Sequence, residues 1–253
     1  FIYPESHQAL KAPESSTISL IAAKTVEHAE YYWGFARLKR LHEQLAPLPY
    51  HKNLDRLPSD YCGREWLADK IDQWASNPEG NQVYLLVAVP GFGKSSFAAW
   101  LCKHRSYIVA HHFFKYDSPV TREVSRLADT LAYQMAEHLP EYLNMLTEQY
   151  VSRVFSDGAT SRFESLITMP LCNVTSHPSE PVVILIDSLD EAVSENGDNK
   201  TALMLARLAS NFPAWIRFII TTRSEPELIC RFNNSTVDYI DVQSNDVRDD
   251  IVD

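Results

Sequence analysis

One stretch restricts the fold more than any other part of the sequence. Residues 83–89 read VYLLVAV, an uninterrupted apolar run, and PGFGKSS follows directly, before a Gly- and Pro-free segment rich in Ala over 94–105. A short continuous apolar run is typical of a strand buried on both faces of a parallel sheet. The order of strand, glycine loop and helix is the order that a phosphate-binding loop requires. The stretch therefore predicts a parallel α/β fold with an anion site after this strand.

The loop matches the phosphate-binding pattern except at its first position. The pattern is Gly, four free residues, then Gly-Lys-Ser/Thr; Gly93, Lys94 and Ser95 supply its end, while Ala88 stands where the first glycine belongs. The glycines turn backbone N–H groups toward phosphate, the lysine neutralises β/γ oxygens, and the hydroxyl completes a Mg²⁺ shell. Ala88 is compatible with this role if its φ is negative. The alternative is a Gly-Pro turn whose lysine is solvated.

Apolar runs and amphipathic segments alternate along the rest of the chain. Further strands are predicted over 107–116, 182–187, 216–222 and 237–242, and helices over 63–76, 94–105, 121–139 and 202–210. Helical spacing over 16–46, closed by Pro47 and Pro49, predicts a helix ahead of the main domain. Alternating strands and helices imply a three-layer α/β fold with a mostly parallel five-stranded sheet.

A second motif, VVILIDSLDEA, delivers acidic residues at the end of an apolar strand. Asp187 ends the run, and Asp190 and Glu191 follow within one turn. Open parallel sheets place ligands at the carboxyl ends of their strands, so Asp187 is expected to hold Mg²⁺. Asp190 or Glu191 is then placed to polarise an attacking water. The alternative is a strand that ends in a helix N-cap with acidic first-turn residues.

A third motif, FIITTRSEPE, ends another apolar strand in Thr221, Thr222 and Arg223. An arginine at that strand end is able to reach a terminal phosphate and report its presence. The alternative pairs this arginine with Glu225 or Glu227. The histidines at 111 and 112 lie inside a predicted strand without a nearby carboxylate or cysteine, so packing is expected for both.

Composition excludes several classes. The formal net charge of −10 argues against sequence-independent binding to nucleic-acid phosphates, and a local basic groove is the alternative left open. The apolar runs are far shorter than the roughly 20 residues that cross a bilayer. The four cysteines lack Cys-x-x-Cys spacing, so we expect reduced, mostly buried thiols and no zinc site.

These motifs together resemble the NACHT-type nucleotide-binding domains of the STAND class of P-loop NTPases. Four features carry the resemblance: GREWL with an apolar helix, VPGFGKSS, the Asp-x-x-Asp-Glu form of LIDSLDEA, and IITTRSEPEL, which together span residues 63–228. The resemblance implies an ATP or ADP site with Mg²⁺, in which Gly63 and Arg64 lie near the nucleoside. The nucleotide-binding set is Arg64, Pro90, Gly91, Phe92, Gly93, Lys94, Ser95 and Ser96, with Ser95 and Asp187 on the metal and Asp190, Glu191 and Arg223 as catalytic or sensing residues.

The resemblance also implies a domain division and a function. Residues 1–50 are expected to form a helical leader, and 51–253 a NACHT-like domain that stops before the winged helix into which such families continue. The expected function is a cytoplasmic, slowly hydrolysing ATPase switch that drives self-association through a larger parent protein. An oligomeric ATPase motor, a small-molecule kinase and a nucleotide-independent scaffold with a degenerate loop are alternatives. Adenine is favoured because no Asn/Thr-Lys-x-Asp guanine signature occurs.

Overall fold

The computed structural model describes residues 33–50, 54, 64–146, 158–176, 178–194 and 196–240. A helix over 33–45 comes first. The elements that follow are α3 (Glu65–Ser76), β1 (Val83–Ala88), α4 (Lys94–His104), β2 (Ile108–Phe113), α5 (Pro119–Arg122), α6 (Val124–His138), α7 (Pro140–Met145), α8 (Ala159–Phe163), η2 (Glu164–Thr168), α9 (Met169–Asn173), β3 (Val182–Asp187), η3 (Leu189–Glu191), α10 (Lys200–Leu208), η4 (Ala209–Asn211), β4 (Ile216–Thr222), α11 (Pro226–Ile229), η5 (Cys230–Phe232) and β5 (Thr236–Ile240).

The five strands form one sheet in the order β2-β3-β4-β1-β5, and every neighbouring pair is parallel. The prediction of an α/β fold with a five-stranded sheet behind an N-terminal helix is confirmed, and over the described strands the sheet is wholly parallel. Strand β4 lies between β1 and β3. All five strands therefore point their carboxyl ends at one edge, and the segments after β1, β3 and β4 meet there.

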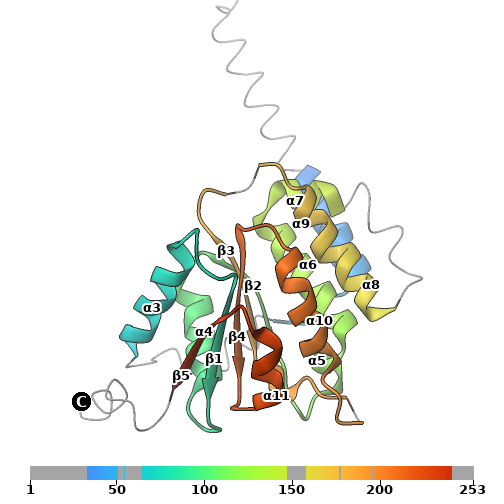
Figure 1. The fold of residues 1–253 in the computed structure, drawn as a ribbon. Coiled ribbons are helices and arrows are strands. Elements are labelled where there is room, and N and C mark those ends of the chain that lie inside the picture. The colour runs from blue at the N-terminus through green and yellow to red at the C-terminus, as the bar shows by residue number, and fades with distance from the viewer. Residues whose placement is uncertain are drawn as a thin grey trace, which may run out of the picture.

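Helices cover both faces of the sheet. Side chains of α3 and α4 pack with Tyr84, Leu86 and Leu185 on one face. The helix over 33–45 packs together with α6 to α10 against Leu85 and Ile184 on the other face. Figure 1 shows the first pair to one side of the strands and the larger group to the other. The arrangement is the three-layer architecture that alternating patterns imply.

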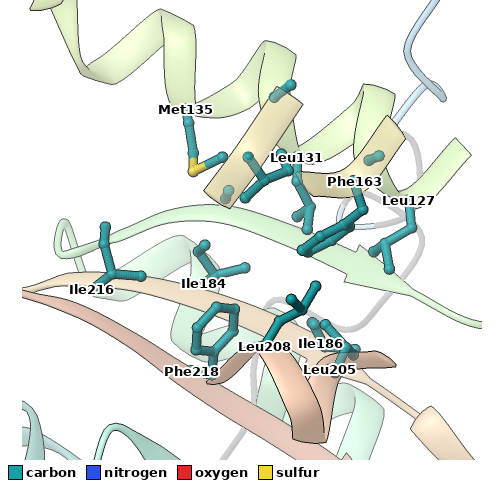
Figure 2. Close-up of a cluster of buried hydrophobic side chains, with 14 of the residues drawn as sticks. Leu127, Leu131, Met135, Phe163, Ile184, Ile186, Leu205, Leu208, Ile216 and Phe218 are labelled. Atoms are coloured by element: carbon teal, nitrogen blue, oxygen red, sulfur yellow. The ribbon is translucent and has the colours of Figure 1, made fainter. Parts of the chain in front are cut away.

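Helix α6 shows why the larger face is well packed. Its apolar stripe presents Leu127, Leu131 and Met135, each with no exposed surface, toward Ile184 and Ile186 of β3 (Figure 2). The i, i+4, i+8 spacing places these side chains on one side of the helix. Each fully buried side chain of this size contributes roughly 1.5–3 kcal/mol to folding.

A short helical layer that the sequence patterns did not predict lies over α6. It consists of α8, the π-helical segment η2 and α9 in one continuous run, shown beside α6 in Figure 1. Phe163, Leu166 and Ile167 are fully buried in it, and Arg162 pairs with Asp129 of α6 at 2.6 Å. Tertiary burial, rather than a regular local period, stabilises this layer.

A glutamine side chain hydrogen-bonds the outer backbone edge of strand β2. Gln134 of α6 accepts a hydrogen bond from the His111 N–H and donates one to the His111 carbonyl, both at 2.9 Å, as a neighbouring strand would. His111 and His112 are both buried, in line with the packing role expected for them. Burial lowers the pKa of His112 to about 4, and its Nε2 lies 2.8 Å from the Thr121 carbonyl.

Several predictions fall partly or wholly outside the described residues. The predicted helix over 16–46 is described from residue 33, where it is helical to residue 45. The predicted fifth strand is described from 236 to 240, and the domain division at residue 50 stays a prediction. Cys172 and Cys230 are exposed, which corrects the expectation of mostly buried thiols. Among the described helices, none combines the length and apolar character needed to cross a membrane.

Candidate functional site

The glycine loop between β1 and α4 has the backbone that its sequence requires. Gly91 and Gly93 adopt φ of 81° and 72°, in the left-handed region that strongly favours glycine. Ala88 ends β1 and is not among the residues of positive φ, so the missing first glycine is not needed for the backbone path. The first backbone N–H groups of α4 have no acceptor within the helix, so they are available as hydrogen-bond donors to a ligand in the loop.

Lys94 begins α4 and folds back over the loop. Its Nζ donates to the carbonyls of Ala88 at 2.7 Å and Val89 at 3.2 Å, and the residue is only 8% exposed. Burial lowers the pKa of Lys94, while the nearby carboxylates of Asp190 and Asp187 act in the opposite direction. The ammonium is thus held inside the loop by weak neutral acceptors that a phosphate would replace with charged ones.

Asp187 lies at the end of β3 and faces the same loop. Its Oδ2 accepts hydrogen bonds from Ser95 Oγ at 2.6 Å and Ser188 Oγ at 3.0 Å, and its Oδ1 accepts one from Thr221 Oγ1 at 2.6 Å. Burial raises the pKa of Asp187, and these three hydroxyl donors act in the opposite direction. The structure therefore brings together Ser95 and Asp187, the two residues that the sequence predicts to bind one metal ion.

The acidic pair after β3 is bound to the arginine after β4. Asp190 accepts from the Arg223 backbone N–H at 3.0 Å and pairs with Arg223 Nε at 3.1 Å. Glu191 pairs with Arg223 Nη2 at 3.1 Å. The sequence left open a pairing of Arg223 with Glu225 or Glu227. The structure instead pairs Arg223 with Asp190 and Glu191, the two acids predicted to polarise the attacking water.

A backbone donor from a further segment also reaches this pair. The N–H of Tyr116, in the loop after β2, donates to Glu191 Oε2 at 2.8 Å. Thr121 organises that loop, since its Oγ1 lies 3.1 Å from the Lys115 N–H and 2.9 Å from the Ser118 carbonyl. The Glu191 carboxylate is therefore bound both by the Tyr116 N–H after β2 and by the Arg223 guanidinium after β4.

The remaining predicted residues lie around the loop. The guanidinium of Arg64, at the start of α3, lies 5.0 Å from the ring centre of Phe92, so the two are in contact. Arg64 itself has a left-handed φ of 66°. Pro90 is exposed on the loop, and Ser96 is half-buried in the first turn of α4. Gly63, expected beside the nucleoside, lies outside the described residues.

The donor set fits Mg²⁺ better than it fits a transition metal. No group of three or more His, Cys, Asp or Glu side chains that could hold a metal occurs among the described residues. Mg²⁺ prefers oxygen ligands and is usually held by one or two carboxylates together with substrate phosphates. One hydroxyl and one carboxylate 2.6 Å apart, beside a phosphate-type loop, meet that requirement.

Two contributions could not be found from the motifs. The sequence placed Thr221 at a strand end, but not its hydroxyl on Asp187, because that contact depends on which strands are neighbours. The Tyr116 N–H has no sequence signal at all, since every residue except proline carries that donor.

A family model supplies the classification. The model described as "Nephrocystin 3, N-terminal" matches residues 63–223, which is more than half of the chain. The chain belongs to the nephrocystin 3 N-terminal family. The matched region of this nephrocystin 3 N-terminal domain begins just before α3 and ends at Arg223, so it includes all the candidate site residues. The described fold is an α/β fold with one parallel sheet, and the NACHT-type resemblance stays a hypothesis.

Solved structures of low similarity were also found. A structure of Drosophila ORC bound to DNA matches 96% of this chain at 13% identity and a TM-score of 0.40. The cytoplasmic domain of EssC matches 70% at 12% identity and a TM-score of 0.29, and EssC (ATPases 2 and 3) from Geobacillus thermodenitrificans matches 66% at 15% and 0.28. The match extends over 37%, 36% and 33% of those chains, respectively.

Proposed function

We propose that this nephrocystin 3 N-terminal family domain is a nucleotide-dependent switch of the NACHT type. It binds ATP or ADP with Mg²⁺, hydrolyses ATP slowly, and couples nucleotide state to self-association and scaffold assembly in a larger parent protein. The observation that carries the proposal is the meeting of the glycine loop, Asp187 and the Arg223 cluster at one sheet edge. We place the domain in the cytoplasm, where free thiols such as Cys102, Cys172 and Cys230 are ordinary.

The loop residues have separate tasks in the proposed site. Backbone N–H groups at Gly91, Gly93 and the start of α4 receive the phosphates, and Lys94 exchanges its two carbonyl acceptors for phosphate oxygens. Ser95 and Asp187 hold Mg²⁺, which supplies positive charge on the phosphate oxygens when bound. Arg64 and Phe92 lie where the loop meets α3 and are assigned to the nucleoside side, with Pro90 and Ser96 completing the loop.

The two acids after β3 have different surroundings, and we assign them different roles. Asp190 has a side chain only 3% exposed and holds Arg223 through two contacts, so it positions the arginine. Glu191 has a side chain 24% exposed, and it is the acid we assign to orienting the attacking water. In this state its two oxygens are occupied by Arg223 and the Tyr116 N–H.

Slow turnover follows from those contacts. Glu191 shares its negative charge with Arg223 and the Tyr116 N–H, which makes it a weaker acceptor for a water, and Arg223 has to leave two carboxylates before it meets a terminal phosphate. Each exchange offsets part of the energy gained from the nucleotide. We expect turnover well below the ~10 s⁻¹ median of enzymes, which suits a switch with a long-lived bound state.

A nucleotide-independent scaffold is the second candidate, and one observation favours it. Lys94 is already satisfied by the carbonyls of its own loop, beside the non-glycine residue Ala88. These contacts satisfy two of the three ammonium donors without a ligand. No direct nucleic-acid contact is proposed for either function, because the chain carries a net charge of −10.

Nucleotide titration of wild type and Lys94→Ala separates the two candidates. Removing the ammonium deletes a charge-assisted phosphate contact, so ADP and ATP affinity should fall roughly 10–150-fold, or about 1.5–3 kcal/mol. Lys103→Ala, an exposed lysine in the last turn of α4, is the matched control and should bind like wild type. Equal nucleotide affinities of wild type and Lys94→Ala would show that the glycine loop does not bind the phosphates. A wild type that binds no nucleotide would favour the scaffold.

A further inference from the structure

A buried threonine joins β4 to the carboxylate that we assign to Mg²⁺. Thr221 has no exposed surface, and its Oγ1 lies 2.6 Å from Asp187 Oδ1, on the neighbouring strand β3. We propose that Thr221 is a positioning residue that orients the Asp187 carboxylate for the metal. The role rests on the nucleotide and Mg²⁺ site proposed above.

The direction of this hydrogen bond is fixed by a second contact. The backbone N–H of Ser188 lies 2.9 Å from Thr221 Oγ1. A backbone N–H can only donate, so the Thr221 oxygen accepts there. A hydroxyl carries a single proton, and that proton is left for Asp187 Oδ1. The order of donation therefore runs from the Ser188 N–H through the Thr221 hydroxyl to Asp187.

This order gives the two carboxylate oxygens different tasks. The terminal torsion of aspartate has broad wells, so packing alone orients a carboxylate weakly. With Oδ1 bound by Thr221, Oδ2 is directed toward Ser95 Oγ at 2.6 Å, the other proposed metal ligand. Without the Thr221 hydroxyl, Asp187 Oδ1 loses its short contact, and the carboxylate is then held through Oδ2 by Ser95 and Ser188, which fix its rotation less tightly.

The next residue provides a matched control inside the same strand. Thr222 is as buried as Thr221, with no exposed surface, but its side chain points to the opposite side of the strand. Within the part of the chain that the structure describes, its Oγ1 has no hydrogen-bond partner. Thr222→Val therefore makes the same chemical change one residue away without touching Asp187.

The experiment compares two pairs of side chains at position 221. Wild-type Thr and Thr221→Val both have branched side chains, and Thr221→Ser and Thr221→Ala both lack the extra methyl group. Only the first of each pair has a hydroxyl. Binding of a fluorescent ADP analogue is titrated against Mg²⁺ and is also measured in EDTA. Mn²⁺ uptake by the ADP complex is followed by electron paramagnetic resonance.

The Thr221 hydroxyl should affect the affinity for Mg²⁺ and Mn²⁺ but not the affinity for ADP without metal. Loss of a residue that orients a metal ligand commonly costs 10–100-fold in metal affinity, so Thr221→Val and Thr221→Ala should raise the Mg²⁺ and Mn²⁺ midpoints by about tenfold or more. Thr221→Ser and Thr222→Val should keep the wild-type midpoints. ADP affinity in EDTA should stay nearly unchanged in all four variants.

Three results would overturn the inference. Midpoints that do not differ between hydroxyl and non-hydroxyl variants would show that Thr221 does not orient Asp187. Equal losses with Mg²⁺ and in EDTA would make Thr221 a general structural residue. A wild type that binds no nucleotide would overturn the proposed function, and this role with it. If Thr221→Val does not fold, the Ser and Ala variants, which differ by the hydroxyl alone, decide the question.

Discussion

Replacing Arg223 by alanine tests the contact between β4 and the acidic pair. The substitution removes the Arg223 Nε contact to Asp190 and the Nη2 contact to Glu191, both at 3.1 Å. It retains the backbone N–H at position 223, which lies 3.0 Å from Asp190 Oδ1. Asp190 is thus left with one of its two Arg223 contacts.

The expected loss of stability follows from the exposure of each partner. A hydrogen bond to a charged group contributes about 1.5–3 kcal/mol, and the Asp190 side chain is only 3% exposed. The Arg223 side chain is 47% exposed, so solvent screening brings that contact to the lower end. The more exposed Glu191 contact adds less than about 1 kcal/mol. Arg223→Ala should therefore destabilise the nucleotide-free domain by about 2 kcal/mol.

Urea denaturation in EDTA, read by tryptophan fluorescence, measures this loss. The same substitution in an Asp190→Asn background should cost less than about 1 kcal/mol, because the buried charge it leaves behind is absent. Arg207→Ala, an exposed arginine on α10, serves as control and should change stability by less than about 0.5 kcal/mol. An equal cost of Arg223→Ala in both backgrounds would refute the coupling between Arg223 and Asp190.

The same variant also tests the sensing role of Arg223. Only ATP offers terminal oxygens to its guanidinium, so Arg223→Ala should reduce the ratio of ATP to ADP affinity while ADP affinity stays nearly unchanged. Competition titrations with both nucleotides measure that ratio. If ADP affinity fell as far as ATP affinity, Arg223 would be a structural residue instead.

Two further predictions concern the acids and a buried histidine. Glu191→Gln with Asp190→Asn should keep ATP binding but suppress phosphate release in a single-turnover assay, whereas Asp187→Asn should impair Mg²⁺-dependent binding itself; rapid hydrolysis by the double variant would place the base elsewhere. Burial lowers the pKa of His112 from 6.5 to about 4, so between these pH values the unfolded chain binds a proton that the folded protein does not. The free energy of unfolding should therefore fall by up to about 3 kcal/mol as the pH falls from 6.5 to 4. Urea denaturation across that range should show a flatter profile for His112→Gln, and parallel profiles would contradict the assignment.

The local sequence determined most of the elements. Strands β3 and β4 have the predicted bounds, 182–187 and 216–222, because a short run rich in β-branched and apolar residues and bounded by turn residues is a local signal. Strand β2 is shorter than its predicted 107–116, because residues after Phe113 form the loop that Thr121 organises. The layer formed by α8, η2 and α9 was not predicted, since its stability comes from burial against α6.

The candidate site shows the same division. Sequence order alone placed a glycine loop, an acidic strand end and an arginine strand end in one α/β domain, because each is a short motif with its own chemistry. Only the sheet order put β4 between β1 and β3, and thereby set the Thr221 hydroxyl on Asp187 and Arg223 on Asp190 and Glu191. Hydrogen bonds between groups more than thirty residues apart depend on which strands are neighbours and in which register, and that is decided by packing of the whole sheet.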